Sequence, residues 1–345
     1  MRAMILDRTC ALSRDARPLR LARLPDPRPV PGEVRIRVSV CGVCHTELDE
    51  IEGRTAPAAF PIVPGHEVVG YVDETGPGAT RHSLGARVGA GWIHHSSGED
   101  DENLSPHFAA TGRDVPGGYA EYMTVHENYA FPIPEIFSDA EAAPLLCAGG
   151  VGYRALRLTG IVDGRSLGLT GFGGSAHLVL PLAKFLYPKS RIYVFARSAR
   201  EREFARELGA DWAGDTEEAA PELLDAIIDT TPAWRPVLAA LTNLKPGGRL
   251  VINAIRKEDA DRDRMASIRY HDHLWMEKEI KTVANITARD LAEFLPLAAR
   301  VPLKPRVQLY PLEEANEALL ALKYDDVRGA KVLQVADETI PPPAQ

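Results

Sequence analysis

The sequence predicts an α/β protein in which a mainly β domain is followed by a doubly wound parallel sheet. Up to about residue 150, short β-branched runs such as Glu33–Val40, Val68–Val72 and Ala120–Val125 are broken by Gly and Pro. This pattern is typical of strands joined by turns. From about Ser166, apolar strand-like runs alternate with helical segments. That alternation indicates a parallel sheet with crossover helices.

The strand-like runs of the second part are Ser166–Thr170, Arg191–Ala196, Ala226–Asp229 and Arg249–Ile255. The helix after the first run is apolar over Leu178–Leu186, whereas Ala199–Leu208 is charged and predicts an exposed helix. After about Asp290, a helix over Leu312–Leu322 and a strand over Lys331–Val335 could complete either domain. The final Pro341–Pro343 segment predicts a disordered tail.

Composition excludes several classes of protein. The chain has 345 residues, 45% of them hydrophobic, which is enough for two cores. It has 40 basic and 48 acidic residues, with no long basic run, so a nucleic-acid partner is not expected. There is neither a signal-like N-terminus nor an apolar stretch of roughly 20 residues. We therefore expect a cytoplasmic protein with no membrane partner.

Three residues of zinc-binding types lie in separate contexts: Cys44 in Cys-Gly-Val-Cys-His-Thr, His66 in Pro-Gly-His-Glu, and Cys147 in Pro-Leu-Leu-Cys-Ala-Gly. A catalytic zinc site takes three such groups and keeps a fourth position for a substrate oxygen. The chain has four cysteines, so a disulfide framework is not expected. Cys41 and Cys44 could also form a redox pair, but a second C-x-x-C for a structural zinc site is missing.

A glycine-rich segment follows the first strand-like run of the second part. It contains Gly171-x-Gly173-Gly174-x-Ala176 and opens a helix-like run. Gly171 allows a tight turn, Gly173 lets the backbone approach a pyrophosphate, and a small residue at Ala176 permits close packing of helix on strand. Taken alone this triplet could be a plain turn, but its position between strand and helix favours a dinucleotide site.

The end of the next strand bears on the choice of nucleotide. An Asp or Glu there usually binds the adenosine ribose hydroxyls, but this position is Ala196. Arg197 and Ser198 could instead bind a 2′-phosphate, with Arg200 and Arg202 as weaker contributors. The pattern favours NADP(H) over NAD(H), unless Arg197 is an ordinary solvated arginine.

Five motifs together resemble the zinc-dependent medium-chain alcohol dehydrogenases over nearly the whole chain. They are Cys44-His45-Thr46, Gly65-His66-Glu67, the Gly-Gly-Tyr-Ala-Glu-Tyr run from Gly117, Leu146-Cys147-Ala148-Gly149, and the glycine run from Gly171. The resemblance implies a GroES-like, mainly β catalytic domain of residues 1–150 and 290–345, with a Rossmann domain of residues 151–289 between. It also implies one catalytic zinc ion in the cleft between the domains.

By this resemblance Cys44, His66 and Cys147 are the zinc ligands, and Glu67 is a neighbouring or transient ligand. Thr46 matches the hydroxyl that starts a proton relay from the alcohol. It could also cap the following helix, and the two roles could coexist. Relatives often end the relay in a histidine five residues after the first zinc cysteine. Here that position is Asp49, which could also be an exposed surface carboxylate.

The implied reaction is hydride transfer between NADP(H) and a primary alcohol or aldehyde. His45 could replace Asp49 at the end of the proton relay. Trp92 is a candidate wall of the substrate pocket, and the alternative is that it belongs to the packed core. Both assignments depend on the resemblance.

The chain departs from the family pattern in two places. Ser97 and Ser105 stand where relatives have cysteines that bind a structural zinc ion, so this second ion is predicted to be absent. Glu47 stands where relatives commonly have Asp. We expect a homodimer or a homotetramer.

Two other functions compete with this one. A metal-free quinone or enone reductase shares the scaffold but lacks the zinc ligands. A catalytically silent NADPH sensor would be expected to have a damaged metal site, whereas this set is complete.

Overall fold

The computed structural model describes residues 1–301, 303–325 and 329–336, so the tail with Pro341–Pro343 lies outside the described residues. The chain divides into two compact units. The first contains residues 1–147 and 285–345, and the second contains residues 148–284. The sequence-based boundaries were at 150 and 290. In the part of the chain that the structure describes, no helix is long and apolar enough to cross a membrane.

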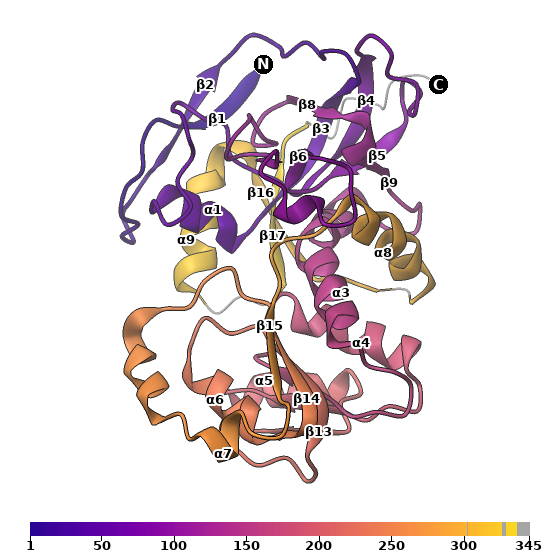
Figure 1. Cartoon of the computed structure of the whole chain (residues 1–345). Coiled ribbons are helices and arrows are strands. Elements are labelled where there is room, and N and C mark those ends of the chain that lie inside the picture. The colour runs from indigo at the N-terminus through magenta and orange to yellow at the C-terminus, as the bar shows by residue number, and fades with distance from the viewer. Residues whose placement is uncertain (302, 326–328, 337–345) are drawn as a thin grey trace. The chain divides into compact units, whose positions relative to one another are not determined.

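The first unit is built on a seven-stranded sheet in the order β16-β17-β3-β4-β5-β9, with β8 also paired to β3. These strands are β3 (Glu33–Val43), β4 (Val68–Thr75), β5 (Arg87–Ala90), β8 (Tyr122–His126), β9 (Ala130–Pro132), β16 (Val307–Pro311) and β17 (Ala330–Gln334). In Figure 1 the yellow β17 lies beside the indigo β3, and the two pair antiparallel from Lys331↔Val43 to Gln334↔Val40. The C-terminal segment therefore completes the first unit, which composition alone could not decide.

Two small sheets and several helices complete this unit. The two-stranded sheets are β1 (Arg2–Leu6) with β2 (Leu19–Arg23), and β6 (Ile93–His95) with β7 (Ala109–Ala110). The α-helices are α1 (His45–Ile51), α2 (Asp139–Ala142), α8 (Ala288–Arg300) and α9 (Ala315–Tyr324). The 3-10 turns are η1 (Glu102–Leu104), η2 (Glu127–Tyr129), η3 (Ala143–Leu146) and η5 (Leu312–Glu314).

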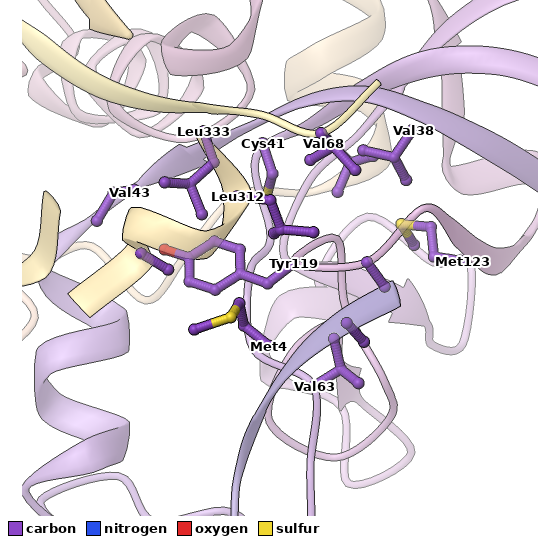
Figure 2. Close-up of a cluster of buried hydrophobic side chains, with 14 of the residues drawn as sticks. Met4, Val38, Cys41, Val43, Val63, Val68, Tyr119, Met123, Leu312 and Leu333 are labelled. Atoms are coloured by element: carbon purple, nitrogen blue, oxygen red, sulfur yellow. The ribbon is translucent and has the colours of Figure 1, made fainter. Parts of the chain in front are cut away.

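A buried aromatic ring fixes the loop that leads to His66, one of the predicted zinc ligands. Tyr119 is fully buried, and Figure 2 shows it among apolar side chains that include Cys41 and Leu312. Gly65 has φ +100°, and a Cβ there would lie 2.4 Å from the Tyr119 ring. Only glycine fits this close approach, so the backbone that carries His66 is held tightly against the core.

The second unit is a six-stranded parallel sheet in the order β12-β11-β10-β13-β14-β15, which confirms the predicted doubly wound fold. The strands are β10 (Leu167–Thr170), β11 (Ile192–Phe195), β12 (Trp212–Gly214), β13 (Leu224–Asp229), β14 (Leu244–Ile252) and β15 (Glu279–Thr282). The helices are α3 (Ala148–Thr159), α4 (Ala176–Leu186), α5 (Ala199–Glu207), α6 (Arg235–Thr242), the 3-10 segment η4 (Asp259–Ser267) and α7 (Tyr270–His273).

The strand order of this sheet reverses between β10 and β13. From β10 the chain moves outward through β11 and β12, and it then resumes at β13 and moves the other way through β14 and β15. In open parallel sheets, ligands bind at the carboxyl ends of the strands where the order reverses. The crevice between the ends of β10 and β13 is therefore the expected ligand position in this unit.

Candidate metal and nucleotide sites

Four potential metal-ligating side chains come together in the first unit. One ligand atom from each of Cys44, His66, Glu67 and Cys147 lies within 4.8 Å of the others. Cys44 follows β3 and the His-Glu pair precedes β4, and these strand ends are neighbours because the two strands pair antiparallel. Cys147 follows the turn η3, which also packs against β3 and β4. The structure thus brings together the three sequence-predicted ligands and the predicted neighbouring carboxylate.

Glu47 orients two members of this group. Its Oε1 lies 2.5 Å from His66 Nδ1, and its Oε2 accepts a 2.8 Å hydrogen bond from the Cys44 backbone N–H. A carboxylate at Nδ1 favours the tautomer in which Nε2 carries a free lone pair. His66 Nε2 is buried and has no hydrogen-bond partner among the described residues. The imidazole is therefore oriented to bind a metal ion through Nε2. The Glu47 side chain, which is longer than that of an Asp, reaches both partners.

The electrostatics of the two thiols favour a thiolate. Cys44 Sγ and Cys147 Sγ are 3.7 Å apart. The Cys147 thiol holds the pKa of Cys44 well below its ordinary value, with help from His66 and against the effect of burial. The thiolate is the form that binds a metal ion.

Glu67 is packed so closely that its carboxylate has little freedom. Burial raises its pKa well above the ordinary value, and the neighbouring Cys44 raises it further. A Cβ at Gly42 would lie 1.9 Å from Glu67 Oε2, so glycine is required beside this carboxylate. A bound cation would favour the ionised form of Glu67.

The donor set fits a zinc ion. Two thiols, one imidazole and one carboxylate are the donor types of catalytic zinc sites, and an unpartnered imidazole nitrogen lies among them. Three ligands with Glu67 close by would leave a position for a substrate oxygen.

The residues predicted for the proton relay lie on α1. Thr46 is buried, and its Oγ1 lies 3.6 Å from Cys44 Sγ. The N-cap of α1 is Cys44, so the alternative role of Thr46 as the helix cap is wrong. His45 is exposed at the start of the helix. Asp49 is fully buried and pairs with Arg54 at 2.5 Å, so its alternative reading as a surface carboxylate is also wrong.

Trp92 lies next to His66, one of the predicted zinc ligands. Its ring centroid is 6.2 Å from that of His66 and 5.5 Å from that of Phe108. The Arg113 Cζ lies 5.1 Å from the centroid of the Trp92 ring. The Arg113 guanidinium donates hydrogen bonds of 2.9 and 2.6 Å to the Asp114 carboxylate. Sequence reasoning found Trp92 but missed Phe108 and Arg113, because neither lies in a motif.

The segment that would carry a structural zinc ion in relatives is fixed by a buried carboxylate. Ser97 and Ser105 each accept a hydrogen bond from a backbone N–H two residues further on. Glu102 accepts from the Tyr129 hydroxyl at 2.6 Å and from the Ala288 N–H at 2.5 Å. Sequence reasoning missed Glu102, which resembles its solvated acidic neighbours in the sequence.

In the second unit the glycine-rich turn lies at the carboxyl end of β10. Gly171 has φ +77°, and a Cβ there would lie 2.9 Å from Thr230 Oγ1 and from Thr231 Cγ2. A Cβ at Gly173 or Gly174 would meet no atom of the described residues within 4 Å. The turn therefore has open space on one side, and the helix α4 begins directly after it. This arrangement fits a dinucleotide pyrophosphate.

The predicted 2′-phosphate residues lie at the end of β11. Ala196 is buried and Arg197 is exposed. Ser198 caps α5: its Oγ accepts from the Glu201 N–H at 3.1 Å and lies 3.1 Å from Glu201 Oε2. This places a carboxylate beside the predicted phosphate position. The Ser-x-x-Glu capping box is visible in the sequence and could have revealed it.

The two weaker candidates differ in their surroundings. Arg202 Nη1 donates to the carbonyl oxygens of Ala196 and Arg197 at 2.8 and 3.0 Å and pairs with Asp215 at 3.1 Å. These bonds connect the Arg202 guanidinium to the end of β11. Arg200 is exposed on α5.

Comparison with known proteins identifies relatives over most of the chain. Residues 30–135 match the alcohol dehydrogenase GroES-like domain. The chain is 40% identical over 332 residues to a probable alcohol dehydrogenase, AdhA, of Mycobacterium tuberculosis, covering 93% of this chain and 94% of the relative. It is 33% identical over 327 residues to a probable cinnamyl alcohol dehydrogenase of Oryza sativa, covering 88% of each. A solved cinnamyl alcohol dehydrogenase of Sorghum bicolor has a TM-score of 0.80 at 26% identity, covering 96% of this chain and 97% of that chain.

A GroES-like unit and a Rossmann unit define a medium-chain dehydrogenase. Given the identity to its relatives over nearly their full length, the chain belongs to the family of zinc-dependent medium-chain alcohol dehydrogenases. Its relatives support an oxidoreductase with alcohol dehydrogenase activity.

Proposed function

We propose that the protein is a zinc-dependent, NADP(H)-preferring alcohol dehydrogenase or aldehyde reductase that acts on primary alcohols or aldehydes. The observation that carries this proposal is the buried, unpartnered Nε2 of His66 within a group that contains two thiols. Cys44, His66 and Cys147 would hold one zinc ion, with Glu67 beside them. A metal-free reductase would have no use for this group.

The chemistry that the bound groups supply is polarisation of the substrate oxygen by zinc and acceptance or donation of hydride by the nicotinamide. Oxidation of an alcohol also releases one proton, which the protein must remove. Thr46 lies at the metal group and is the hydroxyl that would accept this proton. The exposed His45 and the buried Asp49 are the two candidates to pass it on. In aldehyde reduction the same residues would return a proton to the product.

The preference for NADP(H) rests on the end of β11. Ala196 offers no carboxylate to repel a 2′-phosphate, and Arg197 is exposed next to it. Glu201 opposes this preference, because its carboxylate lies beside Ser198. Since an arginine can bind phosphate with two hydrogen bonds, we infer that Arg197 outweighs the single carboxylate.

The test is consumption of NADPH and NADH with a panel of aliphatic and aromatic aldehydes. It is done on the protein as isolated, after metal removal by a chelator, and after zinc is restored. We expect turnover that favours NADPH, is lost with the metal and returns with zinc. Cys44→Ser should lose both zinc and turnover. Cys10→Ser, which removes a thiol outside the metal group, should retain both.

Three outcomes would contradict the proposal in different ways. Metal-independent turnover of enones or quinones would favour the reductase. Tight NADPH binding without turnover of any substrate would favour the sensor. Zinc-dependent turnover with equal use of NADH would support the proposed reaction but contradict the preference for NADP(H).

We also propose that the protein is a homodimer or a homotetramer that pairs through β15. This strand is the last in its sheet among the described residues, and all four of its residues are exposed. Ile280 on the strand is 45% exposed, and Trp275 and Met276, which precede the strand in the sequence, are 47% and 52% exposed. A second copy could continue the sheet and cover these side chains. Ile280→Asp should give a monomer in light scattering, and an unchanged oligomer would exclude this edge.

A further inference from the structure

A buried ion pair lies at the carboxyl end of β13, outside the metal group and the glycine-rich turn. Asp229 is the last residue of the strand, and Lys257 Nζ contacts its Oδ2. The Asp229 side chain is fully buried and that of Lys257 is 9% exposed. Burial of two charges carries a large desolvation cost, so such a pair is weak evidence of stabilisation by itself. The contacts of the ion pair with the loop that follows β13 indicate a further role.

The pair organises the loop of residues 230–233. Lys257 Nζ donates to the carbonyl oxygens of Thr231 at 2.7 Å and Ala233 at 3.0 Å. The Thr231 hydroxyl donates to Asp229 Oδ1 at 2.8 Å. The Glu258 N–H, next to the lysine, donates to the Pro232 carbonyl at 2.7 Å. One ammonium group therefore connects the strand end to two carbonyls of the loop.

This loop forms one side of the crevice where the strand order reverses. The Thr230 N–H and hydroxyl both donate to the Thr170 carbonyl at the end of β10, at 2.9 and 3.0 Å. Thr230 and Thr231 are the side chains that approach the glycine turn most closely at Gly171. A shift of the loop would therefore change the crevice directly.

We propose that Asp229 and Lys257 are positioning residues that hold the 230–233 loop as one wall of the dinucleotide site. The ion pair acts through the loop and need not touch the nucleotide. The inference rests on the proposed function only in that this unit binds a nicotinamide dinucleotide. It predicts which residues determine affinity for the part of the nucleotide that NADPH and NADH share.

The same strand offers a matched control. At its opposite end, Lys245 Nζ pairs with Asp225 Oδ2 at 2.7 Å. Asp225 is the second residue of β13, so this pair lies at the other edge of the sheet from the crevice. Lys257→Met and Lys245→Met each remove one lysine that pairs with an Asp of β13, but only the first variant frees the loop.

The experiment measures Kd for NADPH and NADH from the fluorescence of the bound nicotinamide, together with KM and kcat. For Lys257→Met we expect both Kd values to rise by about tenfold or more, because the loop loses the hydrogen bonds that the charged lysine donates to it. The ratio of the two Kd values should stay unchanged, because the loop lies away from the end of β11. At saturating nucleotide kcat should stay within about twofold of the wild type. Lys257→Arg should restore much of the affinity, and Lys245→Met should bind as the wild type does.

Nucleotide affinity of Lys257→Met within about twofold of the wild type would overturn the inference. So would an equal loss in Lys245→Met, because that would indicate general destabilisation. If Lys257→Met does not fold, the double variant Asp229→Asn/Lys257→Met removes both charges, and unchanged affinity there would also overturn it. A wild-type protein that binds neither nucleotide would instead refute the proposed function.

Discussion

Replacement of Glu47 by Gln tests how the metal group is oriented. The Glu47 carboxylate accepts two hydrogen bonds, from His66 Nδ1–H at 2.5 Å and from the Cys44 N–H at 2.8 Å. A glutamine amide has one oxygen and one NH₂ group. In Glu47→Gln the oxygen can accept from only one of the two donors, and the NH₂ group faces the other. The variant therefore loses one acceptor and the negative charge without a change in size.

The expected size of the effect follows from these two contacts. Loss of a hydrogen bond to a charged group in a buried position costs about 1.5–3 kcal/mol. Removal of the partner of a metal-ligating histidine typically weakens metal binding by about 10- to 100-fold. That range corresponds to about 1.4–2.7 kcal/mol in binding free energy. The two estimates agree, so we expect the zinc Kd of Glu47→Gln to rise by about 10- to 100-fold.

The assay is competition for zinc between the protein and a chromophoric chelator at fixed pH. Glu52→Gln is the control, because Glu52 ends the same helix but bonds Arg54 and Lys323 instead of the metal group. It should lower thermal stability and leave the zinc Kd unchanged. A zinc Kd for Glu47→Gln within about twofold of the wild type would refute the reasoning that this carboxylate sets the ligating tautomer.

Three further predictions concern other parts of the molecule. Gly42→Ala places a Cβ 1.9 Å from Glu67 Oε2, so zinc affinity in the same competition assay should fall, and an unchanged value would show that the carboxylate can move freely. Glu201→Gln removes the charge beside the predicted phosphate position, so the NADPH Kd should fall by about fivefold with no change for NADH; equal shifts would contradict the assignment. Burial raises the pKa of Glu52, but hydrogen bonds from Lys323, Arg54 and the Leu12 N–H lower that pKa from 4.5 to about 2. The contribution of Glu52 to stability is therefore present above pH 4.5 and is lost as the pH falls towards 2. Acid unfolding of Lys323→Met should show a smaller loss over that range, and an identical curve would exclude this pair as a cause.

Local sequence was sufficient for residues whose chemistry depends on their own motif. Cys44, His66 and Cys147 were recognised from their immediate contexts, and the structure brings them together. The doubly wound sheet followed from the alternation of strands and helices, and the structure confirms it. These features were predictable because turn glycines, ligand types and hydrophobic periodicity are properties of short segments.

Residues that act through distant partners were not predictable. Glu102 lies in an acidic run, but it bonds the N–H of Ala288, a residue 186 positions further along the chain. Lys257 has no motif, and its importance comes from Asp229 and the loop after it. In both cases the contact exists only because the fold brings two separate segments together.

The order of residues was enough to predict the two-part architecture, the three candidate zinc ligands and the glycine-rich turn. The pairing of the C-terminal strand with β3 and the burial of Asp49 against Arg54 came instead from the folded chain. This division arises because residue identity sets the chemistry of each side chain and residue order sets the periodicity of each segment. Burial, hydrogen-bond partners and strand neighbours depend on packing between segments that the sequence keeps apart.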